Sequence, residues 1–293
     1  MKQIRLYLYI MFGAFLALFI VGTFVDLQLN QQLFSDKNMF GLAVSAISPS
    51  ISYGPLAICG GGFLALFLRK EYNKWFRAFF MIGFLACLGC AVYFAGLEYF
   101  SVNGFYWVSQ KYLGYIIAIP AEASFSFVGY LLFKKCEQKN IWIFIVVFVA
   151  AFSVALLAGV NGLKAIMHRP RYRSIQSTLM PFYPWYEKCY YYQGYMQTYG
   201  LAKEEFKSFP SGHAAFALSV PIFITFLPII NKEYTKYRLP LFIAGLAYAL
   251  IVMFTRLLVG AHYLSDVSMG SMLITFFMIV GIEVLYKIKK LSI

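Results

Sequence analysis

The sequence predicts an all-α protein, a polytopic membrane helical bundle of about eight transmembrane helices, and three observations support that fold class. Hydrophobic residues make up 61% of the 293 residues and charged residues only 13%, against roughly a quarter in an ordinary soluble domain. The apolar residues occur in blocks of about 20, the helical length that crosses a hydrocarbon layer about 30 Å thick. Basic residues gather in short patches between these blocks. We therefore expect an integral membrane protein.

Windows of about 19 residues locate the expected spans. They lie at residues 6–25, 52–68, 75–97, 113–133, 141–163, 212–230, 240–258 and 264–286. The first block could also be a cleavable signal peptide, but residues 26–30 offer no clear small-residue cleavage site, so we interpret it as a transmembrane helix. The second block is the hardest to bound, because Pro49, Pro55 and the glycines at 60–62 interrupt it. Small residues of this kind allow helices to pack closely.

The basic residues predict the orientation of the bundle. Most of the 25 Lys and Arg residues lie at one set of span ends, in segments 2–5, 69–77, 134–139, 232–238 and 287–290. By the positive-inside rule these ends are cytoplasmic, so both termini are expected inside the cell. The segments around Lys164, His213 and His262 then share the outer face, and together they contain all three histidines of the chain.

Composition also argues against several classes of partner. The net charge is +13, but the basic residues are not clustered on one solvated face as a nucleic-acid site would need, so we expect no nucleic acid partner. Cys87 and Cys90 form the sole CxxC pair, inside an apolar span and with no histidine nearby. Two small packed residues are the better interpretation, and we expect neither a metal site nor a disulfide framework.

The first segment with chemical potential leaves the fifth span. Lys164, His168, Arg169 and Arg171 supply four strong donors within eight residues. One interpretation is a solvated helix end that faces lipid headgroups. The other is a phosphate clamp, since Lys supplies a compact charge and Arg a planar fork of donors that matches phosphate oxygens.

The second segment precedes the sixth span and contains Ser211, Gly212 and His213. Unpaired N–H groups and the positive end of the helix dipole make such a helix start a natural anion site. Glycine lets a phosphate approach the backbone, and the Ser211 hydroxyl adds a donor. A plain N-cap is the alternative, because serine is a preferred capping residue.

The third segment places His262 and Asp266 four residues apart, after Arg256. If the segment is helical there, both side chains lie on one face, and the carboxylate can bond one ring nitrogen and leave the other as a nucleophile. An unpaired carboxylate at the start of an apolar span would be costly, which favours a paired role for Asp266. Glu122 also lies inside an apolar span, but we leave it outside the predicted site.

Together the three segments resemble the type 2 phosphatidic acid phosphatase family, whose superfamily also contains vanadium haloperoxidases and bacterial acid phosphatases. The family pattern is Lys, six residues, Arg-Pro; then Pro-Ser-Gly-His; then Ser-Arg, five residues, His, three residues, Asp. The chain matches it at Lys164, Arg171, Pro210, Ser211, Gly212, His213, Arg256, His262 and Asp266. It departs from the pattern at Tyr172, where proline is usual, and at Thr255, where serine is usual.

The resemblance implies a mechanism and a site. His262 would attack phosphorus while Asp266 holds its ring, and His213 would protonate the leaving oxygen and then act as base toward water. The groups implied to bind phosphate are Lys164, Arg171, Ser211, Gly212 and Arg256, with His168 and Arg169 as secondary contributors. No metal and no cofactor is implied. The expected function is a lipid phosphatase that hydrolyses a phosphomonoester or diphosphate of a lipid through a phosphohistidine.

The same resemblance suggests how the chain is organised. Family members commonly have three spans before the Lys motif, whereas five are counted here, so residues 1–74 are interpreted as two additional N-terminal helices and residues 75–293 as the phosphatase-like core. The Tyr-rich outer loop 172–209 is expected to lie at headgroup level, because rings with one polar end favour the interface. The sequence does not indicate an oligomeric state.

The expected location is a bacterial plasma membrane, with the active site on the extracytoplasmic side. Undecaprenyl diphosphate, phosphatidic acid and phosphatidylglycerol phosphate are candidate substrates. Two rivals remain open: a phosphotransferase that passes the phosphoryl group to another lipid, and a transporter that binds phosphate without chemistry. A transporter would favour internal repeats with interrupted helices, and the sequence shows no convincing repeat.

Overall fold

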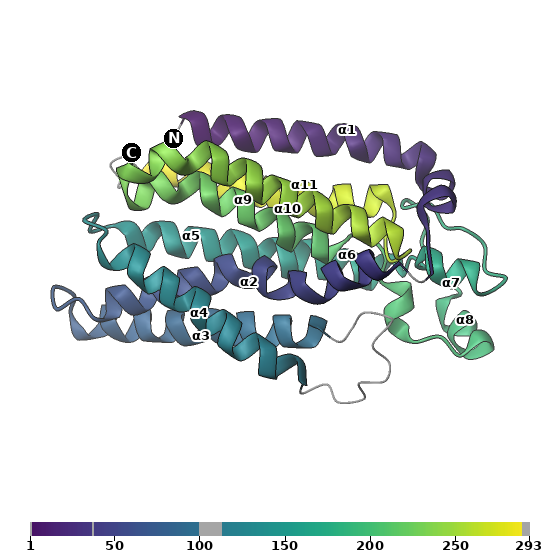
Figure 1. The fold of residues 1–293 in the computed structure, drawn as a ribbon, viewed down its shortest axis with the longest axis horizontal. Coiled ribbons are helices and arrows are strands. Elements are labelled where there is room, and N and C mark those ends of the chain that lie inside the picture. Colours follow the sequence, from purple (N-terminus) through teal and green to yellow (C-terminus); the bar gives the residue numbers. More distant parts are fainter. Residues whose placement is uncertain (1, 37, 100–112, 289–293) are drawn as a thin grey trace.

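The computed structural model describes residues 2–36, 38–99 and 113–288, and over these residues it is a bundle of helices without strands (Figure 1). Eight helices in the described part are long and apolar enough to cross a membrane. The long helices are α1 Lys2–Leu33, α2 Met39–Phe67, α3 Lys74–Tyr99, α4 Leu113–Lys134, α5 Ile141–Val154, α9 Gly212–Ile230, α10 Arg238–Leu258 and α11 Leu264–Ile288. A π-helical turn, Ala155–Asn161, joins α5 to α6 Gly162–Met167, and α7 Tyr172–Gln176 and α8 Tyr192–Tyr199 are short.

The predicted spans fall on these helices, with marked differences in three bounds. The first span was expected to end near residue 25, but α1 continues to Leu33. The fifth was expected to reach residue 163 as one helix, but α5 ends at Val154 and the π-helical turn and the start of α6 complete it. The second span was expected to start near residue 52, but α2 begins at Met39, where the Asn38 side chain accepts the Gly41 N–H at 2.7 Å. Pro49 and Pro55 lie inside α2 without ending it. A proline inside a membrane helix is tolerated where neighbouring helices and hydroxyl side chains satisfy the freed backbone groups, and α2 is among the most buried of the candidate spans.

Glycines allow α2 and α4 to pack with their backbones almost in contact. A Cβ atom added at Gly61 would lie 1.8 Å from the Ser126 carbonyl oxygen, and one at Gly129 would lie 2.1 Å from the Ile58 carbonyl oxygen. Only glycine fits such an approach, as in other small-residue interfaces between membrane helices. The glycine run that complicated the sequence-based bounds of α2 therefore has a packing role.

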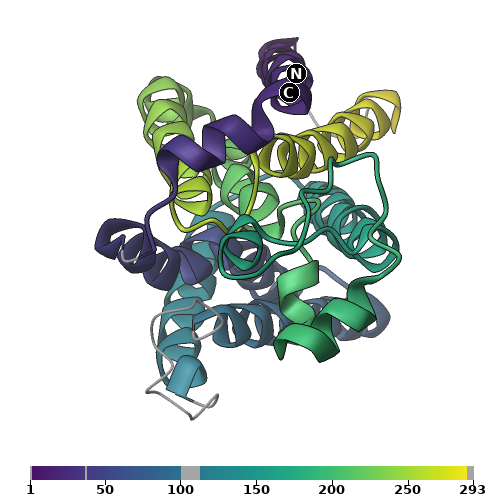
Figure 2. The same ribbon diagram turned by 90° about the vertical axis from the view of Figure 1, so that its right-hand side faces the viewer.

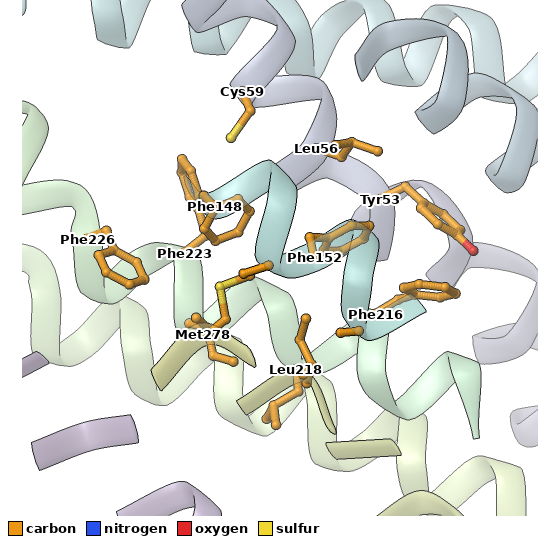
Figure 3. Packing of buried hydrophobic residues seen from close by; sticks show 14 of the residues in the cluster. Tyr53, Leu56, Cys59, Phe148, Phe152, Phe216, Leu218, Phe223, Phe226 and Met278 are labelled. Carbon is orange, nitrogen blue, oxygen red and sulfur yellow. The ribbon is translucent and has the colours of Figure 1, made fainter. Parts of the chain in front are cut away.

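Aromatic side chains fill the centre of the bundle, where α5 packs against α9 (Figure 3). Phe148 meets Phe223 edge to face, with ring centroids 5.3 Å apart, and Phe152 packs against Phe216 at 5.7 Å. Aromatic pairs at these separations add to the stabilisation from burial. The packing fixes α9 against α5, and so sets the segment that follows α5 beside the start of α9.

The bundle has two distinct ends. The start of α1 and the end of α11 lie at one end, whereas α6, α7 and α8 lie at the other (Figures 1 and 2). α1 packs along α11 so closely that a Cβ at Gly22 would lie 2.6 Å from the Ser265 nitrogen. Eight spans, an even number, would place both termini on one side of the membrane. That this side is the cytoplasmic one stays a prediction from the basic residues.

Candidate active site

The three sequence segments meet at the end of the bundle that carries α7 and α8. The Ser211 N–H donates to the Asp266 carbonyl at 2.9 Å, which joins the second segment to the third. The Ser208 N–H donates to the Arg169 carbonyl at 3.0 Å, which joins the second to the first. Residues that are far apart in the sequence therefore form one cluster.

His262 lies in the loop between α10 and α11, and its side chain and backbone are both held in place. Nδ1 lies 2.7 Å from the Ser208 carbonyl oxygen. Because a carbonyl only accepts, Nδ1 carries the hydrogen, and Nε2 is left with its lone pair. The His262 N–H donates to the Arg256 carbonyl at 3.2 Å, and its carbonyl accepts from Asn30 of α1 at 3.1 Å. The ring is 1% exposed.

The expected hydrogen bond between Asp266 and His262 is not formed. The two groups are 3.7 Å apart, beyond hydrogen-bond distance, because α11 begins only after His262 and the two residues do not share a helix face. The carboxylate instead accepts from Arg169 at 2.5 Å, from the Tyr263 N–H at 2.9 Å and from the Ser208 hydroxyl. The Asp266 carboxylate is therefore near the His262 ring without a hydrogen bond to it, and the Ser208 carbonyl orients the ring.

Arg169, considered above as a secondary phosphate contact, is fully buried in an ion-pair network instead. Its guanidinium lies 2.5 Å from Asp266 and 2.9 Å from Asp26 of α1. Asp26 also accepts the Ser265 N–H at 2.9 Å. Arg169 is 0% exposed and Asp26 only 3%. With its donors committed to these partners, Arg169 links α1 to the start of α11 and is not a free phosphate ligand.

The second histidine stands opposite the first. His213 lies in the first turn of α9, with its ring centroid 6.4 Å from that of His262. Nε2 of His213 lies 3.0 Å from the Glu98 carboxylate of α3. Ser211 caps α9, since its side chain accepts the Ala214 N–H at 3.3 Å. The N-cap interpretation of Ser211 is therefore correct, and its hydroxyl hydrogen is still available as a donor.

Cationic groups lie near both histidines. A Cβ added at Gly212 would lie 3.6 Å from the Lys164 ammonium, so this charge lies beside the glycine. Arg256 is 2% exposed and donates to Ser45 of α2 at 2.7 Å. The Nε atoms of Arg171 and Arg256 are buried and have no hydrogen-bond partner within the described residues. Buried donors without partners are costly, so this arrangement is suited to an anion.

Burial lowers the pKa of His262 well below its ordinary value, and the positive charges of Arg171, Arg256 and Lys164 lower it further. The neutral imidazole is therefore the stable form. A neutral ring with its hydrogen fixed on Nδ1 is the form that a nucleophilic histidine requires.

This shift in pKa has a measurable consequence. We expect kcat/KM to decline on the acid side only below pH about 6.5, the value of an unperturbed histidine, because His262 stays neutral where a free histidine is half protonated. Since the unfolded chain takes up this proton first, the contribution of His262 to stability also falls as the pH drops below about 6.5. A pH profile of phosphate release, corrected for substrate ionisation, checks this. An acid limb centred at or above that value would contradict it.

Glu205 anchors the end of the Tyr-rich loop, where the chain comes back to the site. Its carboxylate lies 2.6 Å from the Arg173 guanidinium and accepts from Ser174, while its carbonyl accepts the Arg171 N–H at 2.8 Å. Burial opposes ionisation of Glu205, but the hydrogen bond of Arg173 and the charge of Arg171 outweigh it and lower the pKa to about 2. Glu205 is therefore an ionised anchor that fixes the backbone of Arg171.

The loop 172–209 packs on itself and against α1. His168 does not face the cluster, because its ring stacks on Tyr192 with centroids 3.9 Å apart. Trp185 donates to Thr23 of α1 at 2.9 Å. Tyr190 is 82% exposed. Outward aromatic rings are compatible with the expected position at headgroup level.

Sequence reasoning missed several residues that contact the predicted site, namely Asp26, Asn30, Glu98 and Ser208. Asp26 and Glu98 could have been noticed in the sequence, because acidic residues at membrane depth are rare and mark functional sites. The same sign pointed to Glu122, which is fully buried in α4 with no hydrogen-bond partner among the residues described. Asn30 and the Ser208 carbonyl carried no comparable sign.

The cysteines and the possible metal ligands of the described residues form no disulfide and no metal cluster there. All five cysteines are free. Cys87 is packed in the core, whereas Cys90 is exposed on the helix surface, so only one member of the CxxC pair is a packed core residue. In the described part of the chain no group of three or more His, Cys, Asp and Glu residues could hold a metal ion.

One known family matches the part of the chain that carries the three segments. The family model for the PAP2 superfamily matches residues 142–290, a range that includes all three segments of the site. No curated protein and no solved structure matches the chain significantly. Members of this superfamily are generally phosphatases, which supports a phosphoric ester hydrolase in a protein with eight apolar helices. The chain belongs to the PAP2 superfamily.

Proposed function

We propose that the protein is a membrane lipid phosphatase that hydrolyses a lipid phosphomonoester or diphosphate through a phosphohistidine at His262. The observation that carries this proposal is the opposed pair of histidines, His213 and His262, with centroids 6.4 Å apart and cations near both. Such a pair suits one phosphoryl group, with a nucleophile on one side and a proton donor on the other.

The reaction has two balanced steps. Nε2 of His262 attacks phosphorus, the bond from phosphorus to the lipid oxygen breaks, and its electron pair leaves with that oxygen, which takes a proton from His213. Water then gives a proton to neutral His213 and attacks phosphorus. The phosphorus–nitrogen bond breaks, its electron pair returns to Nε2, and inorganic phosphate leaves.

Charge stabilisation comes from residues on several helices. Lys164, Arg171 and Arg256, the Ser211 hydroxyl and the Gly212 N–H are proposed to bind the equatorial oxygens, with the start of α9 adding its dipole. The phosphohistidine carries extra positive charge on its ring. The Asp266 carboxylate, 3.7 Å from Nδ1, stabilises that charge.

We place the site on the extracytoplasmic side of a bacterial plasma membrane, with both termini in the cytoplasm. The support is the gathering of basic residues at the opposite span ends. Residues 1–74 are proposed as additions to a phosphatase-like core of residues 75–293, although Asp26, Asn30 and Ser45 of these additions contact the site.

A substrate screen tests the proposal. Purified protein in detergent is given labelled undecaprenyl diphosphate, phosphatidic acid or phosphatidylglycerol phosphate, each with and without an unlabelled acceptor lipid. We expect inorganic phosphate to be released from at least one of them, independently of the acceptor. Label that moves to the acceptor would identify a phosphotransferase. Binding without any bond cleavage would favour a transporter.

A further inference from the structure

We infer that Glu98 is the positioning and charge partner of His213, so that the site contains two acid–histidine pairs. The inference rests on the proposed function, in which His213 is the general acid and then the general base. Glu98 lies on α3, outside the residues 142–290 that the family model matches. The pair therefore joins the matched region to the N-terminal part of the chain.

Distance and burial support a specific pair. Oε2 of Glu98 lies 3.0 Å from Nε2 of His213, and the side chains are 23% and 13% exposed. A charge pair that is largely shielded from water is stronger than a pair on the surface. The contact is an ion pair and not a hydrogen bond, because Nε2 has no hydrogen-bond partner within the described residues. In the pairing that we infer, Nδ1 of His213 exchanges the proton with the leaving oxygen.

Glu98 is itself held by Tyr53 of α2. The Tyr53 hydroxyl donates to Oε1 at 3.2 Å, and the ring is 1% exposed. The ring packs against Phe216, one turn after His213 on α9, with centroids 4.5 Å apart (Figure 3). It also stacks on Phe94, one turn before Glu98 on α3, at 5.9 Å. Tyr53 thus fixes the two helices that carry the pair.

The charges around His213 explain why such a partner is needed. A general acid must hold its proton when the substrate arrives, but the positive charges of Lys164 and Arg256 act on His213 and oppose a further positive charge there. The Glu98 carboxylate is a negative group that opposes this effect. It would stabilise protonated His213 before the first step and again after water has been deprotonated.

A competing interpretation starts from the same contacts. The charges of Lys164, Arg256 and His213 all act on Glu98, so its carboxylate could occupy the place of the substrate phosphate and leave when substrate binds. In that case, removal of the charge would strengthen substrate binding. In the pairing that we infer, removal of the charge would slow proton transfer to the leaving group.

Substrates with different leaving groups distinguish these two interpretations of Glu98. A lipid alkoxide needs a proton to depart, whereas a nitrophenolate departs without one, and kcat/KM includes only steps up to that departure. For full-length Glu98→Gln in detergent, we expect kcat/KM to fall about 10- to 10²-fold with a dialkylglycerol phosphate. With an alkyl-tailed nitrophenyl phosphate we expect a change below about threefold. His213→Ala should show the same selectivity with a larger loss.

Glu283→Gln is the matched control. Glu283 pairs with Arg5 at 2.7 Å at the opposite end of the bundle, so this variant should keep wild-type kcat/KM with both substrates. If Glu98→Gln does not fold, Tyr53→Phe removes the donor to Glu98 and should show the same selectivity with a smaller loss.

An equal loss with both substrates, no loss with either, or a lower KM with unchanged kcat would overturn the pairing. Turnover by His262→Ala at a rate within tenfold of the unmodified protein would instead contradict the proposed function, so the two failures are distinguishable.

Discussion

His262→Ala is expected to abolish phosphate release from every lipid substrate. The change removes the nitrogen that is proposed to bond to phosphorus. Catalysis by the remaining charges alone should lower the rate about 10⁴-fold or more. His213→Ala should be less severe, with a loss of about 10²-fold or more, because it removes proton transfer but keeps the nucleophile. Initial rates of phosphate release by the purified variants give both values.

His168→Asn is the control for this pair of variants. The His168 ring stacks on Tyr192 and has a left-handed backbone with φ of 49°, which asparagine tolerates. Its rate should stay close to that of the unmodified protein. Release by His262→Ala at a rate within tenfold of the unmodified protein would contradict the role given to His262.

Arg169→Gln is expected to have the largest effect on stability. Its guanidinium is fully buried between Asp26 and Asp266, and removal of its charge leaves two buried carboxylates without their counter-ion. Breaking a buried ion pair in this way costs about 3–5 kcal/mol. The variant should unfold at a clearly lower temperature or denaturant concentration in detergent.

A second substitution makes this prediction specific. Asp26→Asn added to Arg169→Gln removes one of the two stranded carboxylates, so the double variant should be more stable than Arg169→Gln alone. Arg5→Gln is the control, because its pair with Glu283 is partly exposed and should contribute little. Equal unfolding of Arg169→Gln and Arg5→Gln would show that the buried network does not stabilise the fold.

Much of the fold was predictable because a bilayer imposes a simple rule on sequence. A span needs about 20 apolar residues, and every expected span falls on one of the eight helical stretches that are long and apolar enough to cross a membrane. The predicted start of the second span was wrong because Pro49 and Pro55 normally mark helix ends. Inside this bundle, packing against neighbouring helices outweighs that local preference, and no local pattern in the sequence reports it.

The site was predictable only in part. The three segments could be recognised because their residues are close in sequence, and the structure brings them together. Asp26 and Glu98 reach the cluster from distant helices, and a single carboxylate has no periodic pattern that would reveal its partner. The prediction of an Asp266–His262 hydrogen bond was wrong because it required a helix through His262, whereas α11 begins at Leu264.

The hydrogen-bond partner of the His262 ring shows a more general reason why sequence predicts such a site only in part. Nδ1 is held by the carbonyl of Ser208, a backbone group that every residue has. Sequence motifs report side chains, so a catalytic group oriented by the main chain leaves no mark in them. The shape of the loop before Ser211 decides this contact, and that shape depends on the packing of α9, α11 and the Arg169 segment.

The most direct test is to trap the proposed phosphohistidine. Protein is mixed with a lipid phosphate labelled at phosphorus, quenched within milliseconds in alkaline detergent, and digested for peptide analysis. We expect label on His262 that survives alkali, is lost in mild acid and is absent from His262→Ala. In His213→Ala it should accumulate with the alkyl-tailed nitrophenyl phosphate, whose departure needs no proton, because only the attack of water is then impaired. Rapid phosphate release with no label on the protein at any time, or label that persists in His262→Ala, would contradict the account.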